Sequence, residues 1–219
     1  LFPYTTLFRS RCVGDARRRF DEDALRILRA LRFQAQLGFV IEEETKQAIQ
    51  KQAKFLKDIS AERIQTELTK LLLSDHPETI LDAFDLGVTK VVLPEFDRMM
   101  ETPQNNPHHC YNVGVHTVEA LKNTEPDHIL RWTMLLHDVG KPEARVEGKI
   151  KDSFQGHNTI GEEVSRKILK RLKFDNQTIK QVTRLVYWHD VRFGSLDEVS
   201  KKTVRRWASR ISVPLFEKL

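Results

Sequence analysis

The stretch DEDALRILRALRFQAQLG, residues 21–38, decides the fold class of this chain. Its apolar residues recur three and four positions apart, which is the spacing of one face of an α-helix. Acidic residues stand at its start, where the helix dipole favours negative charge, and Gly38 is a helix-stop signal. The stretch therefore predicts a single helix over residues 21–37. Its apolar face would consist of Ala24, Leu25, Ile27, Leu28, Leu31 and Ala35.

The same helical periodicity continues through most of the chain, and alternating β-branched runs are rare. Ser60 is an expected N-cap, and residues 143–155 form a looser stretch. We therefore predict an all-α protein without internal repeats or low-complexity tracts. Further helices are expected over residues 42–57, 61–73, 77–86, 111–123, 127–138, 159–172, 176–190 and 197–211.

Two segments set the expected domain boundaries. The first ten residues, LFPYTTLFRS, look like the translation of a widely used sequencing adapter, so residues 1–10 are expected to be a non-native scar outside the fold. The segment TPQNNP, residues 102–107, is the clearest linker. We therefore expect one helical domain over residues 11–104, a second over residues 105–195, and the start of truncated C-terminal helices over residues 196–219.

The composition favours a cytoplasmic protein. Of the 219 residues, 40% are hydrophobic and 31% are charged, and no stretch approaches the roughly 20 apolar residues that a membrane-spanning helix needs. Two cysteines, Cys12 and Cys110, indicate a reducing compartment rather than a disulfide-built secreted domain. The formal net charge of +5 is too small to identify a nucleic-acid partner by itself.

Two of the eight histidines are followed directly by aspartate, at His137-Asp138 and His189-Asp190. One such pair alone is weak evidence for a site. Each pair here ends a strongly apolar helical stretch, where unpaired carbonyl groups carry partial negative charge. An imidazole and a carboxylate at such a place stabilise a bound cation. The sequence therefore indicates a place where a cation is stabilised at the end of each of these two helices.

Four short motifs around these pairs resemble the HD-domain metal phosphohydrolases, a helical superfamily. They are GVHT at residues 114–117, LLHDVGKP at 135–142, GH at 156–157 and YWHD at 187–190. The resemblance implies that one metal ion is held by His116, His137, Asp138 and Asp190. It also implies His157 and His189 as candidate ligands of a second ion.

Imidazole and carboxylate ligands without a thiolate suit Mn, Fe, Co, Ni or Mg better than a structural zinc site. A metal pair would generate hydroxide and neutralise phosphoryl oxygens during phosphoester hydrolysis. Asp138 and Lys141 are the candidate residues for this hydrolysis. Ordinary hydrogen-bonded structural roles are expected for the other histidines, which are His76, His108, His109 and His128.

Arginines form the second pattern. Those inside residues 21–37 recur at three-residue intervals and give a drifting cationic stripe opposite the apolar face. Taken alone, such a stripe is a solvated basic face. The stripe and the arginines just before it are Arg17, Arg18, Arg19, Arg26, Arg29 and Arg32.

The segments around the stripe resemble the bacterial CCA-adding enzymes, the tRNA nucleotidyltransferases of the poly(A) polymerase type. The resemblance rests on EDALR at residues 22–26, SAERIQTELTKLLL at 60–73 and LPEFDRM at 93–99. It implies that residues 11–104 are neck helices that bind the acceptor end of tRNA, and that residues 105–195 are an HD domain. The implied nucleotide-binding residues are Glu22, Asp23 and Arg26. The implied RNA-binding residues are Arg17, Arg18, Arg19, Arg29 and Arg32.

The chemistry of base selection supports this resemblance. Cytosine and adenine both present an amino donor beside a ring-nitrogen acceptor, whereas uracil and guanine present a carbonyl beside a ring N–H. Asp23 as acceptor and Arg26 as donor, expected at i and i+3 on one helix face, would accept CTP and ATP and reject UTP and GTP. Spacing alone predicts only a helix salt bridge for this pair.

The sequence also departs from the family. Nucleotide addition needs a Gly-rich loop and paired carboxylates that hold Mg with ATP or CTP, and no such segment precedes residue 11. The acids Asp21, Glu22 and Asp23 are expected to open a helix, not to form that catalytic pair. We therefore expect an internal fragment of an enzyme about twice as long. The alternatives are a tRNA-binding module with a vestigial HD site, and a free-standing HD phosphohydrolase. The oligomeric state is not predicted.

Overall fold

The computed structural model describes residues 9–10, 12, 14–104, 111–148 and 152–190 of the chain. This part is helical almost throughout, which confirms the all-α prediction. The expected helix over 197–211 lies outside the described residues, as do His108, His109 and Cys110. None of the helices in the described part is both long and apolar enough to cross a membrane.

The stretch that was expected to be one helix is two. Helix α1 spans Ala16–Glu22 and helix α2 spans Leu25–Leu37, while Asp23 between them has extended backbone angles, φ −157° and ψ 103°. The carboxylate of Asp23 accepts a hydrogen bond from the amide of Leu25 at 3.0 Å, which competes with continuing the helix. The acids at residues 21–23 therefore close α1 and do not open a helix.

The ends of these two helices follow ordinary capping rules. The side chain of Asp15 accepts a hydrogen bond from the Arg18 amide at 3.2 Å and so caps α1. Gly38 ends α2 with φ 65°, a left-handed conformation that glycine adopts without strain. The predicted end of α2 at Leu37 is therefore correct, and only its beginning is displaced.

A short β-pairing involves part of the segment that was expected to lie outside the fold. Strand β1, Arg9–Ser10, pairs in parallel with strand β2, Val40–Ile41. The exclusion of residues 1–10 is therefore wrong for these two residues. Main-chain hydrogen bonds form the pairing, so it does not depend on which side chains the segment carries.

The first half of the chain packs around α2. Helix α3, Glu43–Gln52, contacts α1 and runs on into a 3₁₀ helix, Ala53–Asp58, so the helix expected over 42–57 changes type midway. Helices α4, Ala61–Leu72, and α5, Thr79–Asp85, cover the apolar face of α2. All six residues predicted for that face are buried.

Three short helices were not predicted. Helix α6, Thr89–Val92, leads into α7, Pro94–Glu101, whose first residue is a proline that needs no hydrogen-bond donor there. Helix α10, Lys141–Ala144, occupies part of the stretch expected to be looser. Helices this short span only about one to two turns, so their hydrophobic pattern is weak.

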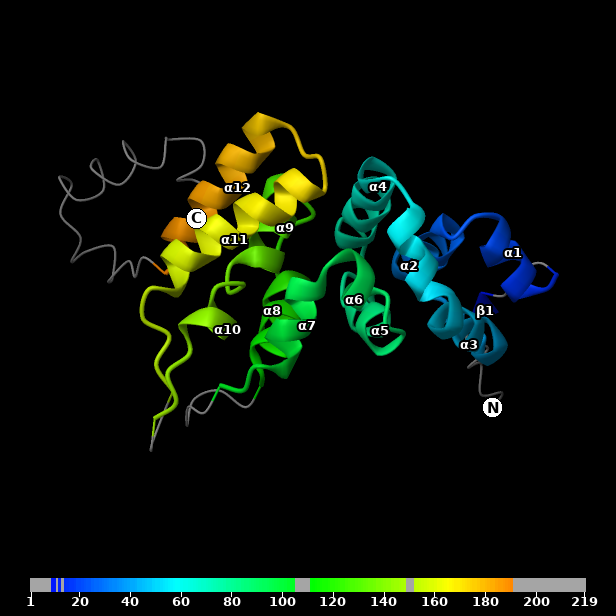
Figure 1. Cartoon of the computed structure of the whole chain (residues 1–219), viewed down its shortest axis with the longest axis horizontal. Coiled ribbons are helices and arrows are strands. Elements are labelled where there is room, and N and C mark those ends of the chain that lie inside the picture. The colour runs from blue at the N-terminus through cyan, green and yellow to red at the C-terminus, as the bar shows by residue number, and fades with distance from the viewer. Residues whose placement is uncertain (1–8, 11, 13, 105–110, 149–151, 191–219) are drawn as a thin grey trace, which may run out of the picture.

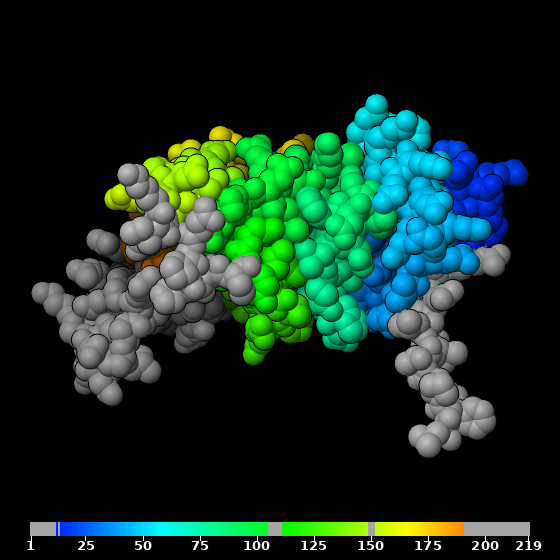
Figure 2. Space-filling view, turned by 90° about the horizontal axis from the view of Figure 1, so that it is seen from below, coloured from blue at the N-terminus to red at the C-terminus, as the bar shows by residue number. Residues whose placement is uncertain are grey.

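The second half contains four longer helices. They are α8, Val113–Lys122; α9, His128–Leu136; α11, His157–Arg171; and α12, Asn176–Trp188. Figure 1 shows α11 and α12 side by side, with α9 packed behind them. The successive parts of the described chain follow one another along the molecule, from α1 at one end to α12 at the other (Figure 2).

The two halves share one buried core. Helix α4 of the first half packs against α9 of the second, where the indole of Trp132 donates a hydrogen bond to Thr69 Oγ1 at 3.0 Å. Trp132 has no exposed surface, so this contact is removed from water. Burying a side chain of this size stabilises the junction by several kcal/mol, about 25 cal/mol for each Å² of apolar surface.

Candidate functional site

Asp138 lies at the centre of a cluster of imidazoles. It follows the end of α9 and is 2% exposed, so its carboxylate is almost completely removed from water. Its Oδ2 atom faces residues from α8, α9 and α10, and its Oδ1 atom faces residues from α11 and α12. A buried carboxylate is costly unless cations or hydrogen-bond donors surround it.

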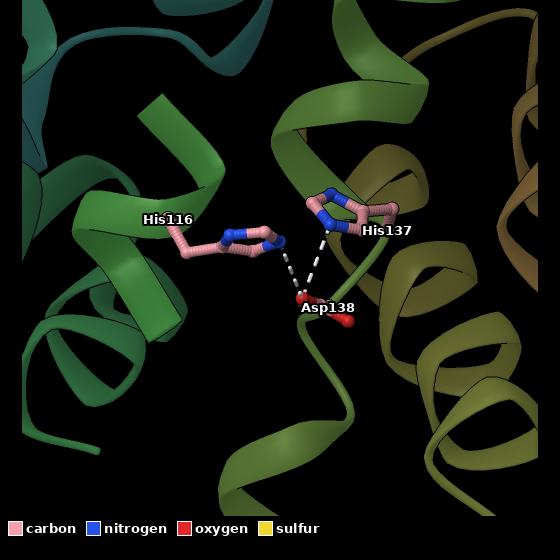
Figure 3. A group of neighbouring side chains, drawn as sticks. All are labelled: His116, His137 and Asp138. Carbon is pink, nitrogen blue, oxygen red and sulfur yellow. Dashed lines mark ion pairs between the residues drawn. The ribbon is translucent and has the colours of Figure 1, made fainter. Parts of the chain in front are cut away.

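The Oδ2 atom has three nitrogen neighbours. Nε2 of His137 lies 3.1 Å from it, Nε2 of His116 lies 3.8 Å from it, and Nζ of Lys141 lies 2.7 Å from it. Figure 3 shows the ring of His116 on α8 and the ring of His137 after α9 pointing toward this oxygen from two helices. The predicted ligands His116, His137 and Asp138 are therefore brought together.

The Oδ1 atom faces the second pair of imidazoles. Nε2 of His157, at the start of α11, lies 3.7 Å away, and Nε2 of His189, after the end of α12, lies 3.6 Å away. Each pair of histidines forms with Asp138 a group whose ligand atoms all lie within 4.8 Å of one another. The carboxylate of Asp138 thus lies between two pairs of imidazoles, one on each oxygen.

Backbone carbonyls fix the orientation of three of these rings. Nδ1 of His137 lies 2.7 Å from the Met134 carbonyl, and Nδ1 of His189 lies 2.6 Å from that of Val186. His157 makes the same contact at 2.8 Å with the residue three positions before it, Phe154. Donation from Nδ1–H leaves a lone pair on Nε2, which is the tautomer that a metal ligand needs.

Two of those lone pairs face each other. Nε2 of His157 and Nε2 of His189 are 3.3 Å apart, and in the tautomer just described neither carries a proton. Two bare imidazole nitrogens at that distance repel each other, so the arrangement needs a proton or a cation between them. This geometry fits a divalent cation on the Oδ1 side of Asp138.

Burial and neighbouring charges shift the pKa values in the cluster. Burial would lower the pKa of His137, but the Asp138 carboxylate beside it raises that pKa above its ordinary value. Burial would raise the pKa of Asp138, but His137, His189 and Lys141 hold it well below its ordinary value. Burial lowers the pKa of His157, which favours the neutral ring that binds metal.

The residues present suit a divalent metal. Oδ2 of Asp138 is buried and has no hydrogen bond of good geometry, although three nitrogens surround it. The donors are imidazole nitrogens and carboxylate oxygens without a thiolate, a set that suits several divalent transition metals. This part of the chain can therefore hold a divalent cation, and its donors do not select one metal.

Two glycines allow the helices to meet at the cluster. A Cβ atom on Gly140 would lie 2.1 Å from the His157 carbonyl oxygen and 2.5 Å from the Gly161 amide nitrogen. A Cβ atom on Gly161 would lie 3.3 Å from the side chain of Val186. Only glycine at position 140 lets the segment after Asp138 lie directly against the start of α11, which brings Asp138 close to His157.

One predicted ligand is not part of the cluster. Asp190 is exposed and belongs to neither ligand group. Its neighbour His189 points toward Asp138, and consecutive residues at a helix end project about 100° apart, so Asp190 points elsewhere. Its assignment as a ligand of the first ion is therefore not supported by this geometry.

The other histidines within the described residues lie away from the cluster. The ring of His76 is 3.2 Å from the carboxylate of Glu78, and that of His128 packs against Phe174 with ring centroids 5.8 Å apart. Both positions agree with the structural roles expected for them. The contact that sequence reasoning missed is Gln104, whose Oε1 accepts a hydrogen bond from Lys141 Nζ at 3.2 Å. A lone glutamine within the predicted linker gives no signal for it.

A second candidate site lies at the junction of α1 and α2. A cavity of about 520 Å³ opens there. Asp23 and Arg63 border it and form an ion pair at 2.8 Å. Arg63 on α4 was not singled out from the sequence, because its role depends on a contact between residues 40 positions apart. The other lining residues are Phe20, Asp21, Glu22, Ala24, Phe55, Asp58 and Ile59.

The expected pairing of Asp23 with Arg26 is not present. Arg26 binds Glu22 at 2.6 Å and the Arg19 carbonyl at 2.7 Å, and it is not among the residues that line the cavity. The two residues do not share a helix face, because Asp23 lies outside α2. The hydrogen bond from Arg26 lowers the pKa of Glu22. Burial alone would raise the pKa of Asp23. Hydrogen bonds from the Leu25 amide and from Arg63 outweigh burial, so this pKa is lowered.

The predicted arginines do not form one continuous exposed stripe in the structure. Arg17, Arg18 and Arg19 are exposed on α1, and Arg29 is exposed on α2. Arg32 instead forms an ion pair with Glu67 at 2.6 Å, with side chains that are only 12% and 10% exposed. Arg32 therefore stabilises the contact between α2 and α4 and is not part of an open basic surface.

The fold and the cluster together define an all-α protein with a histidine–aspartate site of the HD type. Two family models match the chain. The HD domain matches residues 108–208, and the family described as "Probable RNA and SrmB- binding site of polymerase A" matches residues 38–100.

Individual relatives match over most of the chain. It is 37% identical over 197 residues to the A-adding tRNA nucleotidyltransferase of Deinococcus radiodurans, an alignment that covers 84% of this chain and 45% of that protein. It is 33% identical over 199 residues to the Multifunctional CCA protein of Actinobacillus pleuropneumoniae, covering 84% and 48% of the two chains. The chain spans about half the length of the curated relatives it matches.

A solved structure agrees on the fold. The crystal structure of the Bacillus stearothermophilus CCA-adding enzyme in complex with CTP superposes with a TM-score of 0.61 at 23% identity, covering 96% of this chain and 46% of that one. The family matches and the relatives show that the chain is similar to part of the tRNA nucleotidyltransferases. A free-standing HD phosphohydrolase is not favoured, since the relatives align over more than either half of the chain.

Proposed function

We propose that this chain is the nucleotide-selecting and tRNA-binding part of a tRNA nucleotidyltransferase, joined to an HD domain that hydrolyses phosphoesters. The observation that carries the first role is the cavity at the α1–α2 junction, where the carboxylate of Asp23 and the guanidinium of Arg63 meet. One relative is named an A-adding tRNA nucleotidyltransferase and the other a Multifunctional CCA protein. CTP, ATP and the acceptor end of tRNA are accordingly the proposed partners, and the cytoplasm is the proposed location.

In this proposal Asp23 accepts the amino group of cytosine or adenine, and Arg26 donates to the adjacent ring nitrogen. Glu22 holds Arg26 until a base arrives, since the two form an ion pair at 2.6 Å. Arg63 orients Asp23 from the opposite wall of the cavity. The exposed arginines at residues 17–19 and 29 contact the tRNA backbone or the triphosphate, and Mg accompanies ATP or CTP in the intact enzyme.

The test of this role uses the intact enzyme with its transferase head, supplied with tRNA that ends before CCA. Incorporation of each of the four nucleotides is measured in turn. Asp23→Ala is expected to lower the preference for CTP and ATP over UTP and GTP, because the acceptor that reads the amino group is lost. Unchanged selectivity would leave Asp23 with only its role in ending α1.

A second role, hydrolysis by the HD domain, is favoured by the position of Asp138 between two imidazole pairs. Bound divalent cations, with Mn, Fe, Co, Ni and Mg as candidates, would supply a water of lowered pKa and positive charge for the phosphoryl oxygens. His116 and His137 would hold one ion on Oδ2 of Asp138, and His157 with His189 would hold a second on Oδ1. Lys141, released from Asp138, would pair with a phosphate oxygen.

The test of the second role is hydrolysis of 2′,3′-cyclic nucleotides and phosphomonoesters, with each metal added back to chelated protein. We expect turnover with at least one metal, and loss of it in Asp138→Ala. His128→Ala is the matched control, because that ring packs against Phe174 away from the cluster. Bound metal without turnover on any of these substrates would favour a vestigial site in a tRNA-binding module.

A further inference from the structure

A groove between α11 and α12 combines positive charge with aromatic rings. It encloses about 260 Å³ beside the side chains of Lys180, Arg184, Tyr187 and Trp188 on α12. These four residues stand at positions i, i+4, i+7 and i+8, so they lie along one side of the helix. The opposite wall comes from α11, which runs beside α12 (Figure 1).

The positive charge of this groove is largely uncompensated. On α11, Arg166 forms an ion pair with Glu162 at 2.6 Å, so these two lining residues neutralise each other. Neither Lys180 nor Arg184 has an ion pair with any residue in the part of the chain that the structure describes. The Nε atom of Arg184 is also buried without a hydrogen-bond partner. Within the part of the chain that the structure describes, this donor has no acceptor, and leaving a buried donor unpaired is costly.

The aromatic end of the groove is held in place. The rings of Tyr187 and Trp188 pack edge to face, with centroids 5.2 Å apart, and both side chains are half-buried. The Tyr187 carbonyl accepts a hydrogen bond from Asn158 of α11 at 3.4 Å. A partly exposed, packed indole beside two cations that have no ion pair among the described residues can bind a nucleobase and its phosphates, because every base has a π face and every linkage a negative charge.

We infer that this groove binds single-stranded RNA, with a base stacked on Trp188 and the adjoining phosphates paired with Lys180 and Arg184. A duplex would not suit it, because paired bases are stacked on one another and do not expose a face to a side chain. The groove is distinct from the junction cavity of the first half, and it ends one residue before His189 of the cluster. The inference rests on the proposed function for the identity of the nucleic acid.

The test measures binding of a fluorescent, unstructured RNA of about ten nucleotides to the full chain at several salt concentrations. Lys180→Ala and Arg184→Gln are each expected to weaken binding and to reduce the slope of log Kd against log salt by about 0.7. Trp188→Ala is expected to weaken binding by roughly five- to 150-fold, which corresponds to about 1–3 kcal/mol, while Trp188→Phe keeps most of the affinity. Heparin, which has charges but no bases, should lose affinity in the first two variants only.

Matched controls separate the groove from charge and aromaticity in general. Lys167→Ala with Lys170→Ala removes two exposed positive charges of α11 that do not line the groove. Tyr111→Ala removes an aromatic ring that is 49% exposed elsewhere. These controls should bind the RNA nearly as the unmodified chain does, and thermal melting verifies that every variant is folded.

Two results would overturn the inference: absence of RNA binding, or salt slopes and affinities that are the same in the groove variants and the controls. A separate measurement tests the proposed function independently of the groove. Binding of whole tRNA to the Arg17→Ala, Arg18→Ala, Arg19→Ala triple variant tests the neck. If that variant loses tRNA affinity while the groove variants do not, the groove assignment fails and the proposed function stands.

Discussion

The Asp138 cluster and the α1–α2 junction use the same kinds of side chain in opposite settings. In the cluster, a carboxylate that is 2% exposed is enclosed by four imidazoles that come from four helices. In the junction, the Glu22–Arg26 pair joins side chains that are 42% and 31% exposed and four residues apart on the chain. Ion pairs of the second kind contribute little to stability and exchange easily, whereas a buried carboxylate without its partners is strongly destabilising.

This difference separates a fixed site from an adaptable one. The cluster is suited to a cation that stays bound, since three of its rings are locked by backbone carbonyls. The junction is suited to a ligand that changes in every cycle, since its charged groups already have partners that they exchange at low cost. We therefore expect substitutions in the cluster to change stability and metal content, and substitutions in the junction to change selectivity.

The largest effect on the comparison should come from Gly140→Ala. The new methyl group would lie 2.1 Å from the His157 carbonyl oxygen and would push α11 away from Asp138. We expect a loss of about 3 kcal/mol or more in the free energy of unfolding, measured by denaturant, together with weaker metal binding. Gly87→Ala is the control, because Gly87 has φ 72° but open space around it, and it should lose only about 1–2 kcal/mol. Equal losses in the two variants would show that the close approach is not needed.

The next effect separates two arginines that look alike in the sequence. Arg32→Ala leaves Glu67, which is 8% exposed, without its partner, so unfolding should become easier by about 3 kcal/mol. Arg29→Ala removes an exposed charge and should change stability by less than about 0.5 kcal/mol. The effects on tRNA binding should be the opposite. Arg29→Ala should lower the slope of log Kd against log salt, and Arg32→Ala should leave it unchanged. If Arg32→Ala is as stable as the unmodified chain, Arg32 would instead be assigned to the RNA-binding arginines.

A smaller effect is expected when the junction itself is dissected. Arg26→Ala should relax the discrimination against UTP and GTP in the intact enzyme by one to two orders of magnitude, about 1–3 kcal/mol, because a donor to the base is lost. Arg63→Ala should relax it less, since the Leu25 amide still holds the carboxylate of Asp23. Steady-state incorporation of each nucleotide measures both. Greater relaxation in Arg63→Ala would assign the donor to Arg63, which already lines the cavity.

The smallest effect concerns Asp97 in α7, between the two regions. Burial raises the pKa of Asp97, and Glu101 nearby adds to the shift, although Thr89 opposes it. A raised pKa in the folded state means that stability is complete at pH values below the unfolded pKa and falls as the pH rises through the folded value. Asp97→Asn should therefore be more stable than the unmodified chain at pH 7 by up to about 1 kcal/mol and equal to it at pH 3. Parallel stability curves across this pH range would contradict the assignment.

The sequence predicted the cluster better than the junction, for physical reasons. Histidines followed by aspartate at the ends of apolar helices are rare enough to be recognised, and burial then brings them together. Asp190 does not join the cluster in the structure, because a helix end projects neighbouring residues about 100° apart and the sequence does not say which of the two points inward. The break at Asp23 was missed because its Asx-type hydrogen bond to Leu25 competes with a strong helical pattern. Arg63 and Gln104 were missed because their partners are 40 and 37 residues away.

The division of the chain into two domains remains a prediction. The expected boundary near residue 104 lies between α4 and α9 along the chain, but the buried core continues from α4 across to α9. The two halves should therefore unfold together, despite their separate chemistry. Coincident transitions by metal release and by helix loss would support this cooperativity.

The most direct test of the account is the metal content of purified protein, measured by elemental analysis, combined with its melting temperature before and after chelation. The account predicts bound divalent transition metal, a lower melting temperature after chelation because metal binding is linked to folding, and recovery when metal is returned. Asp138→Ala should contain no metal and should not respond to the chelator, whereas His128→Ala should behave as the unmodified chain. Metal-free protein that regains no ion on exposure to Mn, Fe, Co, Ni or Mg, with an unaltered melting temperature, would contradict the account.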